Sequence, residues 1–192
     1  MSIDTALHPA DRSAAPRRTT RRRLWIAALV VVALAAGATA WLWRHPSQSF
    51  DGGYGLRLDG QVGESVWTSL TSPTTPGAEQ VSIRGLEPHI VVDEAAVEIE
   101  YLICVLDPGV LERDGAFIMG GDSAHVDHYC ASTRPAVGST LRLRSEPREQ
   151  LIVGITPTRP GRSVIRGHRL SFGVGWQVGA DELEVETRIV TR

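Results

Sequence analysis

The pattern of hydrophobic and polar positions divides the chain into distinct parts. Residues 1–23 show no apolar periodicity and are rich in Ala, Pro, Thr, Ser and Arg, which predicts a disordered basic tail. Residues 24–43 carry no charge, and as a helix they would be about 30 Å long, the thickness of a bilayer's hydrocarbon core. From residue 54 onward, short apolar runs are broken by Gly, Pro and Asp. We therefore predict a transmembrane helix at 24–43, a linker at 44–53 and one β-domain at 54–192.

Alternation with a period of two residues indicates strands in this last part. Within Val97–Leu106, apolar residues alternate with Glu98 and Glu100, and the second half becomes apolar on both faces, as in a strand lying between two layers. No window of 11 residues or more holds a helical stripe. The predicted strands are Tyr54–Leu58, Val81–Leu86, Val97–Leu106, Phe117–Met119, Thr140–Arg144, Leu151–Thr156, His168–Val174 and Leu183–Val190. The fold class is therefore mainly β, an antiparallel β-sandwich without helices, for which an immunoglobulin-like architecture is one option.

Charge predicts the orientation of the span. A cluster of five arginines within residues 17–23 directly precedes the apolar run and only Arg44 directly follows it, which places the N-terminus in the cytoplasm and the β-domain outside. The tryptophans lie near the two ends of the run, where indole rings prefer the headgroup boundary. The predicted membrane-interface residues are Arg21, Arg22, Arg23, Trp25, Trp41 and Trp43.

A cleaved export signal is the alternative to an anchor. Ala38-Thr39-Ala40 fits a signal-peptide cleavage site, with residues 24–35 as its apolar core. Apolarity continues through Trp43, which favours an uncleaved signal anchor. Both alternatives place the β-domain across the membrane.

The distribution of charge also argues against nucleic acid as a partner. The net charge of −2 combines +5 in residues 1–44 with −7 in residues 45–192. Binding to phosphates needs surplus cations, and the β-domain has surplus acids. The lipid bilayer, through residues 24–43, and another envelope protein are the partners that we expect.

The two cysteines, Cys104 and Cys130, lie in the part predicted to be exported, where disulfides persist. Paired, they would close a loop with 25 residues between them, worth about 3.5 kcal/mol of stability in the chain-entropy model. The alternative is a catalytic or metal-binding thiol. The immunoglobulin hallmark of distant cysteines around a buried Trp is missing, because this pair encloses no Trp.

One segment gathers titratable side chains. Asp122, His125, Asp127 and His128 could bind a divalent transition metal, because imidazole and carboxylate together suit zinc, copper or nickel. In a strand the two histidines would point to opposite faces, so only a helical turn or a loop would bring them together. A solvated polar loop beside the disulfide is the interpretation that we favour.

Gly121-Asp122-Ser123 resembles the nucleophile segment of trypsin-like proteases and of the Gly-Asp-Ser-Leu lipases. The Gly-Gly-Pro segment expected after the protease triplet is replaced by Ala-His, and the α/β domain expected around the lipase triplet is absent from the predicted elements. An envelope hydrolase using Ser123 is therefore only a minor alternative.

A glycine-rich segment near the C-terminus offers a possible interaction patch made of Arg166, Arg169, Phe172 and Trp176, since Trp and Arg dominate interface hot spots. The favoured alternative is that both aromatics pack inside the sandwich, because their shared parity places them on one face.

The sequence therefore predicts a single-pass membrane protein whose extracytoplasmic β-domain acts as a binding or accessory-subunit module, without catalysis and without a cofactor. A metal-binding or metal-delivery domain using residues 122–128 is the alternative function.

Overall fold

The computed structural model describes residues 17–44, 50, 53–71, 80–114, 120–144 and 146–192; the side chains of residues 17–22 and 24 lie outside this description. The chain forms two compact units, residues 1–42 and 43–192. The predicted tail residues 1–16, most of the predicted linker and the predicted strand Phe117–Met119 lie outside the described residues.

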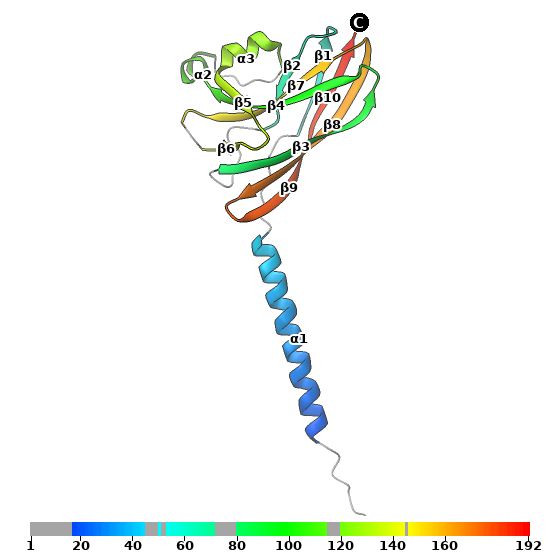
Figure 1. Cartoon of the computed structure of the whole chain (residues 1–192), viewed down its shortest axis with the longest axis vertical. Coiled ribbons are helices and arrows are strands. Elements are labelled where there is room, and N and C mark those ends of the chain that lie inside the picture. Colours follow the sequence, from blue (N-terminus) through cyan, green and yellow to red (C-terminus); the bar gives the residue numbers. More distant parts are fainter. Residues whose placement is uncertain (1–16, 45–49, 51–52, 72–79, 115–119, 145) are drawn as a thin grey trace, which may run out of the picture. The chain divides into compact units, whose positions relative to one another are not determined.

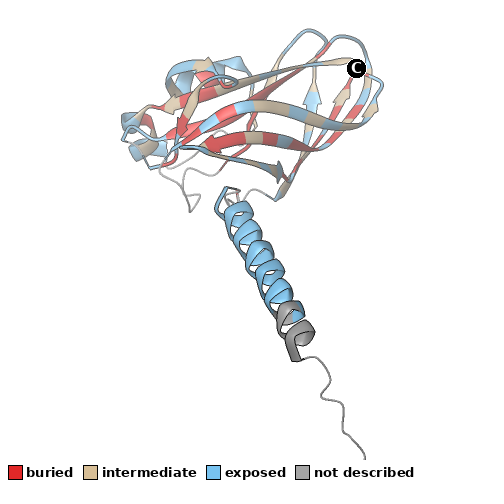
Figure 2. Cartoon of the chain, turned by 60° about the horizontal axis from the view of Figure 1, so that its bottom comes forward, coloured by how far each residue is buried: buried red, intermediate tan, exposed pale blue. Residues whose placement is uncertain are grey.

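The first element, α1 (Arg17–Arg44), is a helix of 28 residues that begins seven residues before the predicted span. The prediction of a disordered tail is therefore wrong for residues 17–23, because the helix that the apolar run forms extends into the preceding arginine-rich segment. The segment Trp25–Arg44 of α1 has a mean hydropathy of 2.1 and is long and apolar enough to cross a membrane. Figure 2 colours the described residues of α1 as exposed. Trp25, Trp41 and Trp43 are each about two-thirds exposed. The side chains of Arg21 and Arg22 are outside the description.

The second unit is built mainly from strands (Figure 1). Its elements are β1 (Tyr54–Gly60), β2 (Val66–Ser69), β3 (Gln80–Asp93), β4 (Val97–Leu106), α2 (Pro108–Asp114), α3 (Ser123–Tyr129), β5 (Cys130–Pro135), β6 (Thr140–Arg142), β7 (Glu149–Pro157), β8 (Gly161–Val174), β9 (Gln177–Leu183) and β10 (Val185–Thr191).

These strands form two sheets. The first has the order β1-β10-β8-β3-β6, with β9 also pairing with β8, and the second has the order β2-β7-β4-β5. Strand β1 runs parallel to β10, with Tyr54 opposite Val185 and Gly60 opposite Thr191, and the other described pairs are antiparallel. The prediction of an antiparallel sandwich is corrected at this one pair, because side-chain alternation is the same in parallel and antiparallel strands.

The main core lies between the two sheets. Ile83, Ile165 and Phe172 of the first sheet cluster with Leu151 and Val153 of the second. This mainly β, two-sheet architecture confirms the predicted fold class at the level of the sheets. Strand β7 is buried on both faces, because its second face packs beneath a further layer.

That further layer covers the outer face of the second sheet. Val126 of α3 packs with Trp67, Cys104, Leu106 and Ile152 in a second apolar cluster. The two faces of β4 therefore pack in different clusters: Ile103 lies in the main core, and Cys104 and Leu106 lie in the second cluster. This confirms the prediction that the second half of β4 lies between two layers.

The predicted disulfide is formed. Cys104 and Cys130 are joined, with Cα atoms 5.4 Å apart. Cys104 lies on β4 and Cys130 begins β5, its neighbour in the same sheet, so the bond ties α3 to this sheet. It does not bridge the two sheets, as the immunoglobulin hallmark would.

The prediction that the domain lacks helices is wrong. Helices α2 and α3 have seven residues each, and each buries a single valine, Val110 or Val126. A helix of seven residues is too short to show a helical stripe, because that pattern needs a window of about 11 residues or more.

Strands β2, β5 and β9 were also not predicted. Strand β3 continues through Pro88 because its register with β8 shifts there.

The folded β-domain begins earlier than the predicted residue 54. Phe50 is 5% exposed, its ring packs edge-to-face on Phe172 with 5.3 Å between centroids, and its backbone N–H donates to Asp181 Oδ2 at 2.9 Å. A residue inside the predicted linker thus belongs to the core.

Candidate functional site

The segment predicted to bind metal forms helix α3 and its N-cap. The Oδ1 atom of Asp122 accepts hydrogen bonds from the backbone N–H of His125 at 3.2 Å and lies 3.0 Å from Nδ1 of the same residue. The His125 side chain, and then its backbone N–H, hold the pKa of the Asp122 carboxyl below its usual value. Asp122 is thereby occupied as a helix cap.

The second histidine of the segment has a different partner. His128 Nε2 lies 3.0 Å from Oδ2 of Asp114, at the end of α2, so it joins the two short helices. Asp127 is exposed on the same helix. Although the helix brings His125 and His128 to i,i+3 positions, the described residues contain no group of three or more His, Cys, Asp or Glu side chains placed to hold one ion.

Ser123 is the first residue of α3. Among the described residues its hydroxyl makes no hydrogen bond to either histidine of the segment. A serine hydrolase would need a base within hydrogen-bond reach of this oxygen.

The proposed patch of two arginines and two aromatics is divided by the fold. Phe172 is 1% exposed in the core, which confirms the prediction that it packs inside. Trp176 is 60% exposed, which contradicts that prediction for the second aromatic. The shared parity is lost because Gly175, with φ of +58°, and Trp176 form the turn between β8 and β9.

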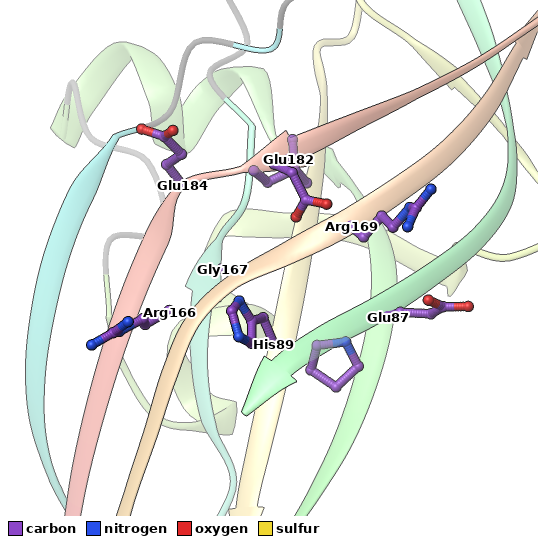
Figure 3. Close-up of a pocket in the computed structure, with 9 residues that line it drawn as sticks. Glu87, His89, Arg166, Gly167, Arg169, Glu182 and Glu184 are labelled. Carbon is purple, nitrogen blue, oxygen red and sulfur yellow. The ribbon is translucent and has the colours of Figure 1, made fainter. Parts of the chain in front are cut away.

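Arg166 and Arg169 line a polar groove on the outer face of the first sheet (Figure 3). The groove has a volume of about 430 Å³. Its lining residues are Glu87, Pro88, His89, Arg166, Gly167, Arg169, Glu182, Leu183 and Glu184.

The groove forms where strand pairing on both sides of β8 is irregular. Between Ile165 and His168, β8 advances three residues while the facing chain advances four, from Leu183 to Thr187. On the other side, the register with β3 shifts between Pro88 and Ile90. A Cβ at Gly167 would lie 2.8 Å from the carbonyl oxygen of Leu183, so glycine allows the close approach of the two backbones.

The groove carries both signs of charge on exposed side chains. Three carboxylates, from Glu87, Glu182 and Glu184, face two guanidinium groups, which extend to opposite sides of β8 in Figure 3. No ion pair within 4.0 Å involves any of these groups in the part of the chain that the structure describes. Their charges therefore face solvent, where a partner could pair with them.

A buried polar pair lies beneath the groove, between the sheets. His168 is fully buried beside Gly167, and its Nδ1 lies 2.9 Å from the hydroxyl of Tyr101 on β4. Its Nε2 has no hydrogen-bond partner among the described residues. Burial lowers the pKa of His168 to about 4 and raises that of Tyr101, so both side chains stay neutral at pH 7.

Comparison with known proteins does not assign the groove or the α3 segment. No protein-family model matches the chain, and no curated protein matches it. Of the groove residues, the sequence predicted Arg166 and Arg169 but missed His89 and the three glutamates. They lie on β3 and on the β9–β10 junction, and only a prediction of strand pairing could have brought them together.

Proposed function

We propose that this chain is a single-pass membrane protein whose β-domain lies outside the cytoplasm. Three observations support the proposal: the apolar segment Trp25–Arg44, the excess of arginines before it, and the disulfide, which persists in oxidising compartments. A cleaved export signal ending at Ala40 would leave the same domain on the same side of the membrane.

We further propose that the β-domain is a binding module that acts as an accessory subunit of another envelope protein. The observation that carries this proposal is the groove around Gly167, whose charges of both signs are not paired with one another. A surface with such charges favours a protein partner that presents the complementary pattern, because complementary charges steer association and fix its register.

Crosslinking in native membranes tests this function. The full chain with a C-terminal tag is crosslinked mildly, purified and analysed by mass spectrometry, which should show one stoichiometric membrane-protein partner. Arg169→Glu should reduce the yield of that partner, because it reverses a charge in the groove. Arg57→Glu is the matched control, since Arg57 is an exposed arginine of the same sheet, on β1, that does not line the groove.

Two results would contradict the proposal. Absence of any stoichiometric partner would argue against an accessory subunit, and equal loss of the partner in both variants would argue against the groove as its binding site. The topology has its own test, because a reporter fused after Arg192 that works only in the cytoplasm would overturn the predicted orientation.

A further inference from the structure

The β8–β9 hairpin ends in exposed apolar side chains. The turn between Val174 and Gln177 has two residues, and positive φ at Gly175 alone makes it a type II′ turn, the geometry that matches the twist of a hairpin. Trp176 in this turn is 60% exposed, and Val178, two residues further on, is 36% exposed. Single exposed apolar residues are common on proteins, so the position of this tip in the fold decides its meaning.

The chain enters the folded β-domain near the tip of the same hairpin. Phe50 is the first described residue after α1, and it is buried. Its ring packs on Phe172 of β8, and its backbone N–H donates a hydrogen bond to Asp181 of β9. From Phe172 the tip at Trp176 is four residues away, or about 13 Å along an extended strand. The other end of β8, at Gly161, is eleven residues away, or about 36 Å.

The covalent chain limits how the domain can face a bilayer. Six residue spacings separate Arg44 from Phe50, and they can span at most about 22 Å. With α1 across the membrane, as proposed above, the Gly161 end cannot point at the lipid, because about 36 Å of β-domain does not fit beneath a tether of about 22 Å. If the domain stands upright on the bilayer, its hairpin end must therefore be the lower one.

The chemistry of the tip suits lipid headgroups. Indole rings favour the boundary between headgroups and hydrocarbon, because one edge is polar and the rest apolar. The Arg84 guanidinium lies next to Gly173, three residues before Trp176, where an added Cβ would be 3.1 Å from Nε, so a cation that can bind lipid phosphates lies near the end of the hairpin.

We propose that the hairpin tip, defined as Trp176, Val178 and Arg84, rests in the headgroup layer of the bilayer. This contact would hold the β-domain upright, with Arg169, seven residues up β8, about 23 Å above the headgroups. A partner that binds the groove would then need an extracytoplasmic part that extends about 23 Å from the headgroups. The inference rests on the proposed membrane anchor, and its experiment separates the two.

Depth-dependent quenching tests the contact in the full chain. The only two cysteines form the disulfide, so Trp176→Cys introduces one reactive thiol that can carry an environment-sensitive fluorophore. The labelled protein is reconstituted in vesicles of phosphatidylcholine and phosphatidylglycerol, with either lipids that carry a quencher near the headgroup or iodide in the buffer. Val62→Cys is the matched control, because Val62 is an exposed apolar residue next to β1, whose Gly60 lies level with the Gly161 end.

The expected result is several-fold stronger lipid quenching, and weaker iodide quenching, at position 176 than at position 62. Protein that resists carbonate extraction but shows equal iodide quenching at both positions would overturn the hairpin contact and leave the anchor standing. A label at 176 that neither quencher reaches would also overturn it, since protein rather than lipid would then cover the tip. Protein extracted by carbonate would overturn the anchor and, with it, the contact.

Discussion

Protonation of His168 should destabilise the β-domain, and His168→Gln should remove that effect. His168 is fully buried between the sheets, its Nδ1 is bonded to the neutral hydroxyl of Tyr101, and no carboxylate is within ion-pairing distance of it among the described residues. The imidazolium would therefore be a buried charge without a counter-ion, which the fold disfavours. Glutamine keeps a hydrogen-bonding group opposite Tyr101 and does not titrate.

The size of the effect follows from linkage between protons and folding. Burial lowers the pKa of His168 from 6.5 to about 4, so between these values the unfolded chain binds more protons than the folded one. This contribution to stability is present above pH 6.5 and is lost as the pH falls toward 4. It amounts to about 2 kcal/mol between pH 7.5 and pH 5, and to about 3 kcal/mol at most, because each unit of pKa corresponds to about 1.4 kcal/mol.

Urea unfolding of the full chain in nonionic detergent, measured between pH 7.5 and pH 4.5, tests this prediction. Other groups that titrate in this range contribute equally to both proteins, so the difference between wild type and His168→Gln isolates His168. His89→Gln, the same substitution at an exposed histidine, is the matched control. Parallel pH profiles for wild type and His168→Gln would refute the reasoning.

Further predictions concern packing, the disulfide and metal. Gly154→Ala should lower the free energy of unfolding by about 2 kcal/mol, because a Cβ there would lie 2.7 Å from the buried ring of Trp67. Gly55→Ala, where an added Cβ would meet no non-neighbouring atom within 4 Å, is its control, and equal urea midpoints for the two variants would contradict the packing argument. Reduction of the disulfide should cost about 3.5 kcal/mol in the same assay, and an unchanged midpoint would show that the bond adds nothing. Zinc should not bind stoichiometrically at Asp122–His128, because the two histidines pair with separate aspartates; one site per chain in calorimetry, lost when both histidines become alanine, would refute this.

The candidate site shows where reasoning from sequence stops. The residues Asp122, His125 and His128 stand close together in the sequence, and their short helix does bring the histidines onto one face. The spacing of residues in the sequence did not indicate that His128 would pair with Asp114, which lies eight residues before Asp122. Trp176 and Phe172 share parity along the chain, yet the turn at Gly175 places one outside and the other in the core.

The sequence by itself determined the elements that depend on local pattern. An uninterrupted apolar run specifies α1, and two-residue alternation specifies β4 with the predicted bounds, because each pattern matches the geometry of one element. Tertiary structure alone decided the parallel pairing of β1 with β10, the burial of Phe50, the meeting of Tyr101 with His168 and the groove at Gly167. Each of these joins segments far apart in the chain. Register between such segments is set by packing of the whole core, and periodicity along one segment carries no information about its distant neighbour.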